Sequence, residues 1–63
     1  MTIDEAISLV GRWPQDRTVP RKLSDAVAAA RGEDRMKLGM MFEALAAASE
    51  TEADILLVRK YAS

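Results

Sequence analysis

The residues of this 63-residue sequence that could do chemistry are its carboxylates, its cations and its single tryptophan. The chain has no cysteine and no histidine, so it lacks the commonest strong nucleophile, the usual general base and the usual zinc ligands. The closely spaced carboxylates are Asp4 and Glu5, Glu33 and Asp34, and Glu50 and Glu52. Each pair falls where a helix is expected to begin, and capping and the helix dipole explain acidic residues there. We therefore expect no catalytic, cofactor-binding or metal-binding residues, no small-molecule substrate and no enzymatic activity.

Between residues 12 and 22 the chain has four cations and one anion, Asp16. A segment of this kind can contact phosphates through its cations and stack a base on its aromatic ring. The side chains that could do so are Arg12, Trp13, Arg17, Arg21 and Lys22. In the opposing interpretation, Trp13 folds back over the core and the cations are ordinary solvated charges. We favour this second interpretation, because an aromatic residue beside a helix end usually packs.

The composition narrows the class of protein. Nine basic and ten acidic residues give a net charge of −1, which argues against a generic polyanion binder and against an acidic nucleic-acid mimic. The N-terminal residues do not resemble a signal peptide, and no apolar run approaches the roughly 18 residues of a membrane-spanning helix. We expect a cytoplasmic protein that does not enter a membrane. Alanine richness and an excess of arginine over lysine favour a bacterial or phage source.

The elements that position these residues are expected to be helices. Thr2-Ile3-Asp4-Glu5 has the pattern of a capping box, and the helix that follows should end near Gly11 and Pro14. Pro20 suits the first turn of a second helix, because the amide proton that proline lacks would have no partner there. Gly32 is a natural C-terminal cap for that second helix.

A third helix is expected over about residues 33–49 and a fourth over about 52–61. The fourth helix has two overlapping start signals, at Ser49 and at Thr51. A helix that continues through Gly32 is an open alternative and would reduce four helices to three. Nothing in the sequence resembles a strand. The expected fold class is all-α, a compact bundle of three to four short helices in one domain that covers residues 1–63.

Apolar spacing predicts which helix faces are buried. The first helix should bury Ile3, Ala6, Ile7 and Val10, with Leu9 and Trp13 at the edge of the stripe. The second helix should bury Leu23, Ala26, Val27 and Ala30. The third helix should bury Leu38, Met41, Phe42 and Leu45. These three stripes predict one shared core.

The third helix also has a second apolar stripe, on the side away from the predicted core. Its members, joined by two residues of the last helix, are Met36, Met40, Ala47, Ile55 and Val58. A core below roughly 70–80 residues rarely supplies more than about 3–5 kcal/mol of net stability, and association with another chain is one of the usual supplements. We therefore interpret the second stripe as a partner-binding surface.

The sequence thus favours a small protein-binding regulator or inhibitor that docks on a larger protein through an apolar helix face. Whether the partner is a second copy, forming a homodimer, or a foreign protein is left open. The alternative function is a nucleic-acid-associated regulator that uses the basic segment 12–22.

Overall fold

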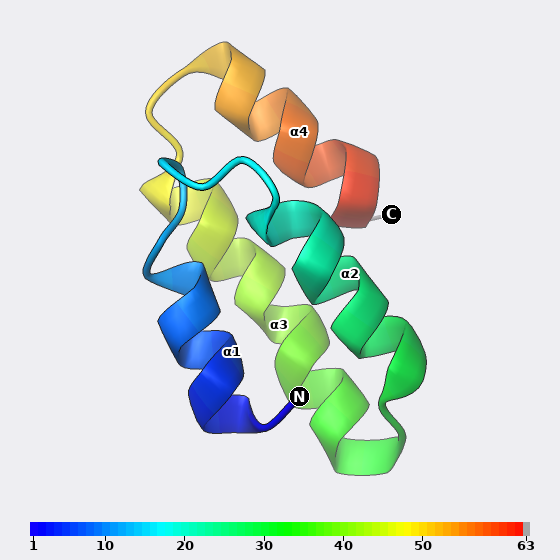
Figure 1. The fold of residues 1–63 in the computed structure, drawn as a ribbon. Helices are drawn as coiled ribbons and strands as arrows, with labels where there is room; N and C mark the ends of the chain where they lie inside the picture. Colours follow the sequence, from blue (N-terminus) through cyan, green and yellow to red (C-terminus); the bar gives the residue numbers. More distant parts are fainter. Residues whose placement is uncertain (63) are drawn as a thin grey trace.

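The computed structural model describes residues 1–62, and these residues form four helices without a strand. The helices are α1 (Ile3–Val10), α2 (Val19–Ala29), α3 (Gly32–Ala48) and α4 (Glu52–Ala62). In Figure 1, α1 and α2 flank α3, and α4 crosses the end of the bundle where α2 begins and α3 ends. The helix α3 contacts all three other helices. The predicted all-α bundle is confirmed, with α3 at its centre.

Local sequence signals account for the starts of α1 and α2. The backbone N–H of Glu5 donates to Thr2 Oγ1 over 3.1 Å, and the N–H of Thr2 donates to Glu5 Oε1 over 3.0 Å. This reciprocal pair is the predicted capping box. Pro20 lies in the first turn of α2, as predicted.

The chain breaks between α2 and α3. Ala30 has extended backbone angles, and Gly32 has a φ of +60°, a region that glycine enters without the steric penalty of a Cβ atom. A helix that continues through Gly32 is therefore excluded over the described residues. The expectation that Gly32 caps α2 is wrong, because α2 ends at Ala29 and Gly32 is the first residue of α3.

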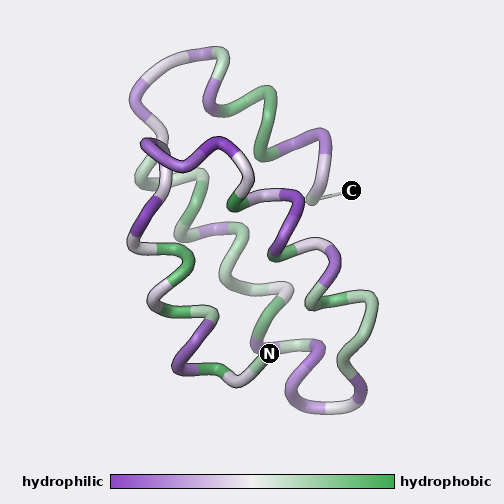
Figure 2. The backbone as a smooth tube through the Cα atoms, viewed as in Figure 1, coloured by the Kyte–Doolittle hydropathy of each residue, from purple (hydrophilic) through white to green (hydrophobic). Residues whose placement is uncertain are grey.

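The core contains side chains from all four helices and from the α1–α2 loop. Its buried apolar members are Ala6, Leu9, Trp13, Val19, Leu23, Leu38, Leu45 and Val58. Met41 and Phe42 are half-buried and pack against this core, so the predicted stripe of α3 faces inward. Figure 2 colours the backbone by hydropathy: much of α3 is hydrophobic or neutral (green or pale), whereas the α1–α2 loop is largely hydrophilic (purple).

The buried face of α1 differs from the predicted one. Ile7 is exposed, whereas Leu9 and Trp13, which were expected at the edge, are in the core. Ala6, Leu9 and Trp13 are spaced i, i+3 and i+7, so they lie on one side of a helical path. Because the large indole enters the core, that side of α1 turns inward and Ile7 turns outward.

Removal of a core side chain should unfold most of the chain. Leu23 is fully buried, and Leu→Ala substitutions at such positions cost about 2–5 kcal/mol. This is comparable to the roughly 3–5 kcal/mol of stability expected for a core of this size. We expect Leu23→Ala to lose most of its helical circular dichroism at 37 °C, while Ile7→Ala, a matched change at an exposed position, keeps it. Equal melting temperatures for the two variants would contradict this description of the core.

Candidate functional site

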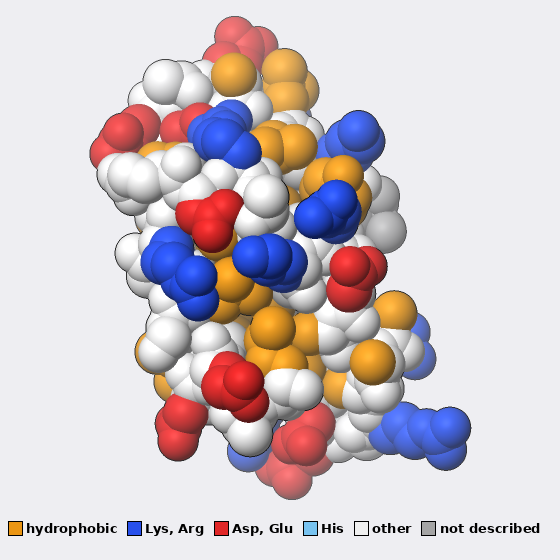
Figure 3. All heavy atoms as spheres, in the orientation of Figure 1, with side chains coloured by type: hydrophobic (Ala, Val, Ile, Leu, Met, Phe, Trp, Pro, Cys, Tyr) orange, Lys and Arg blue, Asp and Glu red, His pale blue; other side chains and the backbone are white. Residues whose placement is uncertain are grey.

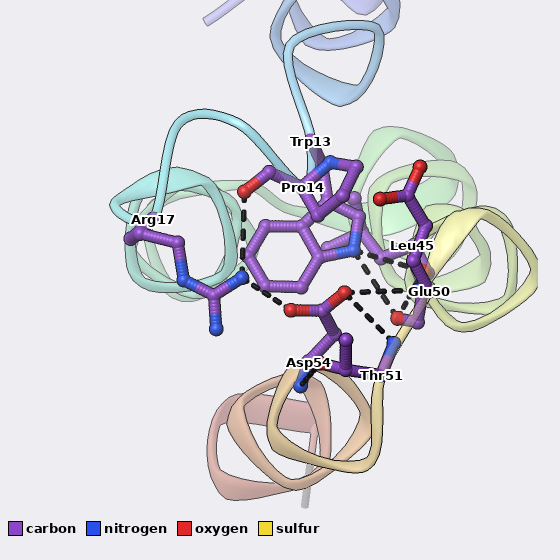
Figure 4. Close-up of polar contacts among 8 residues, drawn as sticks. Trp13, Pro14, Arg17, Leu45, Glu50, Thr51 and Asp54 are labelled. Carbon is purple, nitrogen blue, oxygen red and sulfur yellow. Dashed lines mark hydrogen bonds and ion pairs between the residues drawn. The ribbon is translucent and has the colours of Figure 1, made fainter.

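Trp13, the most function-like residue of the basic segment, is part of the core. Its side chain is 3% exposed, and its indole Nε1–H donates to the carbonyl oxygen of Leu45 over 3.1 Å and to Ser49 Oγ over 3.2 Å. Figure 4 shows the indole between the α1–α2 loop and the end of α3. The interpretation that Trp13 folds back over the core is confirmed, and the ring is not available to stack on a base.

Arg17 covers the indole from the solvent side. The centre of its guanidinium lies 4.7 Å from the centroid of the Trp13 ring, within cation–π distance. The same guanidinium forms an ion pair with Asp54 and donates a hydrogen bond of 3.4 Å to the carbonyl oxygen of Pro14. Arg17 is therefore engaged inside the molecule, although its side chain is partly exposed.

Asp54 completes this arrangement from α4 and is only 5% exposed. Its Oδ2 accepts the backbone N–H groups of Glu50 over 2.8 Å and Thr51 over 3.1 Å, while Thr51 Oγ1 accepts the N–H of Asp54 over 3.1 Å. Thr51, rather than Ser49, is thus the capping residue of α4. The hydrogen bond from the Glu50 N–H, followed by that from Arg17, lowers the pKa of the Asp54 carboxyl to about 2, against the opposing effect of burial.

Trp13, Arg17 and Asp54 therefore form one structural unit, which we call the Trp13 cluster (Figure 4). Sequence reasoning did not identify Asp54 as a member. Its cap on Thr51 belongs to the start signal at Thr51 given above, because Asp54 is the third helical residue after Thr51. The pairing with Arg17, 37 positions away, has no local signal.

Three exposed cations of the basic segment form no ion pair within residues 1–62: Arg12, Arg21 and Lys22. Asp16 lies close enough to be affected by two of them. Hydrogen bonds from Thr18 are the main cause of its lowered pKa, and the charges of Lys22 and Arg12 lower the pKa further. Figure 3 shows Lys and Arg side chains gathered over the α1–α2 loop and the beginning of α2, with acidic side chains among them. This surface has mixed charge.

The second apolar stripe of α3 lies on the outside of the molecule. Met36 and Met40 are 62% and 63% exposed, and Ala47 is exposed on the same side of the helix. Leu38 and Leu45 point the opposite way, into the core. We call Met36, Met40 and Ala47 the outer α3 face.

Of the two α4 residues that were predicted to extend this surface, one is exposed and the other is buried. Ile55 is exposed, but Val58 is only 4% exposed and belongs to the core. The expectation that Val58 contacts a partner is therefore wrong. The cap at Asp54 fixes the rotation of α4, and Val58 lies one turn further along the same buried side. Leu56, which we did not select, is exposed instead, because periodicity cannot assign faces within the continuous run Ile55–Val58.

The lowered pKa of Asp54 predicts a pH dependence of folding. An unfolded carboxyl with an ordinary pKa binds a proton more readily than the folded one, so Asp54 contributes its full stabilisation above about pH 4. The contribution should fall as the pH is lowered toward 2 and be absent below that. We expect Asp54→Asn to unfold at a lower urea concentration than the wild type at pH 6, and this difference should shrink toward pH 2.

The control is Asp25→Asn, which removes the same charge from an exposed position on α2. It should keep the wild-type urea midpoint across the pH range. Hydrogen bonds also lower the pKa values of Glu5 and Asp16, but both residues are unchanged in the two variants, so the comparison isolates Asp54. A difference between wild type and Asp54→Asn that stays constant from pH 6 to 2 would refute the assignment.

The described residues include no group of three or more His, Cys, Asp or Glu side chains that could hold a metal ion. Within residues 1–62, each helix is too short or too polar to cross a bilayer. Comparison with protein-family models, curated proteins and solved structures finds no match to this chain.

Proposed function

We propose that this chain is a small regulator or inhibitor that docks on a larger protein through the outer α3 face. The observation that carries the proposal is the exposure of Met36 and Met40, both more than 60% accessible, on the central helix of the bundle. An isolated exposed methionine needs no explanation, but two methionines one turn apart form an apolar patch, with Ala47 on the same side two turns further along and Glu43 between Met40 and Ala47.

The chemistry of the outer α3 face suits docking. Methionine side chains are unbranched and polarizable, so they adapt to irregular apolar surfaces. Lys37 and Glu33 form an i, i+4 ion pair of 3.6 Å on the same helix, and Glu43 is exposed between Met40 and Ala47 on the same side of α3. Charges at the rim of an interface mainly affect the association rate, while the apolar centre supplies most of the affinity. The partner surface should accordingly be apolar opposite the two methionines.

The cytoplasm of a bacterium or of a phage-infected cell is the setting we propose. The alternative, a nucleic-acid-associated regulator, has less support. Of the five residues named for it, Trp13 is buried and Arg17 is engaged with Asp54, which leaves Arg12, Arg21 and Lys22. Three cations could make about three phosphate contacts at most, and so few contacts give weak binding at physiological salt.

Site-specific photo-crosslinking tests the proposal. A photoreactive phenylalanine analogue is placed at position 40, or at position 25 as a control, because Asp25 is also exposed but lies on α2. In cells of the source organism we expect position 40 to give a discrete cross-linked protein and position 25 to give none. Met36→Asp, combined with the probe at position 40, should abolish the cross-link without changing the helical circular dichroism.

The mass of the cross-linked species separates the outcomes. A partner larger than this chain supports the proposal, whereas a species of twice the chain mass would show that the outer α3 face forms a homodimer instead. No cross-link from position 40, or equal cross-linking from position 25, would overturn it. Tight, salt-sensitive DNA binding that is lost in Arg12→Glu/Lys22→Glu would support the alternative function.

A further inference from the structure

A groove lies where α2, α3 and α4 meet, beside the outer α3 face. It has a volume of ≈ 360 Å³. The residues on which the argument depends are Val27, Ala28, Arg35, Gly39, Phe42 and Tyr61. Its floor is mostly apolar, with the half-buried Phe42 and Gly39 contributed by α3.

Gly39 is not required by the packing of this chain. Glycine within a helix costs about 1 kcal/mol relative to alanine, so it needs a compensating reason. A Cβ atom built at Gly39 would meet no other group within 4 Å. No neighbouring helix therefore needs the close approach that a glycine permits. Because Gly39 has no side chain, the floor of the groove is open at this position.

The charged side chain that lines the groove is a cation. Arg35 lines it and has neither an ion pair nor a side-chain hydrogen bond within residues 1–62, and the lining includes no acidic residue. Lys60 lies beside it, with Nζ 5.5 Å from the centroid of the Tyr61 ring, and has no carboxylate partner in the described chain. An occupant with a carboxylate is therefore complementary to this rim.

The shape of the groove favours a helix over a small molecule. Sites for small ligands enclose most of the ligand surface, whereas this groove lies between helices and is open to solvent on one side. From Arg35 to Phe42 the floor follows two turns of α3, about 10 Å. A partner helix can place two apolar side chains, one turn apart, along such a length.

We propose that this groove binds an amphipathic helix of another protein, with apolar side chains over Gly39 and Phe42 and a carboxylate beside Arg35. The site goes beyond the function proposed above. Gly39 points about 60° from Met36 and about 100° from Met40 around α3, so Met40 is the residue of the outer α3 face that best separates the two surfaces. The two surfaces can therefore be tested separately.

A displayed library of helical peptides of about 15 residues, with randomised apolar and charged positions, supplies the probe. The full chain is the target, and Gly39→Leu is the counter-target. A leucine here is a good helix former and would extend into the groove, so the variant should fold at least as well as the wild type. We expect the selected peptides to share two apolar residues spaced i, i+4 and a nearby Asp or Glu, and to bind Gly39→Leu about tenfold or more weakly.

Charge reversal tests the role of Arg35. In a second selection, Arg35→Glu should enrich peptides with Lys or Arg at the charged position in place of Asp or Glu. Arg21→Glu, a matched reversal at an exposed cation of α2 outside the groove, should enrich the same acidic peptides as the wild type.

Ala44→Leu is the control for the bulk added in Gly39→Leu. It adds a side chain on an exposed part of α3 outside the groove and should leave peptide binding unchanged.

Three results would overturn the proposal: no binders that distinguish the wild type from folded Gly39→Leu, binders without a carboxylate preference, or an unchanged preference in Arg35→Glu. Loss of thermal unfolding cooperativity in Gly39→Leu would also contradict the proposal, because it would show that the packing of the chain requires a glycine at position 39. Met40→Asp should bind the selected peptides like the wild type. Binders that depend on Met40 but not on Gly39 would assign docking to the outer α3 face alone.

Discussion

The hydrogen bonds of the Trp13 indole hold together parts of the chain that are far apart in sequence. The indole N–H donates to Leu45 and Ser49 at the end of α3, so the loop after α1 is fixed to the central helix. Arg17 covers the ring and pairs with Asp54, which in turn caps α4. A buried indole N–H without an acceptor would be costly, and no buried side-chain N or O atom among residues 1–62 lacks a hydrogen-bond partner.

This structural role decides which surfaces remain for binding. The segment that combines cations with an aromatic ring would by itself suggest contact with nucleic acid, but its ring and one of its arginines are already used within the molecule. The helix α3 has the opposite character. It is surrounded on its inner side, yet it leaves the outer α3 face exposed and contributes Gly39 and Phe42 to the groove. Both proposed binding surfaces therefore lie on the helix that the other three pack against.

Local patterns were sufficient for much of the fold and insufficient for the cluster. The capping box at Thr2, the proline in the first turn of α2 and the inward stripe of α3 are set by residues within one or two turns, so the sequence predicted them. The rotation of α1 depends on the distant contact of Trp13 with Leu45, and for that reason Ile7 was misplaced. Val58 was misplaced because Asp54, through its cap and its ion pair with Arg17, sets the rotation of α4. Burial of a carboxylate is not visible in a periodicity of apolar residues.

The most direct test of this account is hydrogen exchange at the Trp13 indole, followed by NMR. The chain has one tryptophan, so its Nε1–H gives a unique signal. If the indole belongs to the core and donates to Leu45 and Ser49, this proton should exchange as slowly as the most protected backbone amides of α3. Exchange at the rate of an unfolded peptide, with the α3 amides still protected, would contradict the account, because it would show that Trp13 lies on the surface. The indole would then be available to the basic segment 12–22 for nucleic-acid binding.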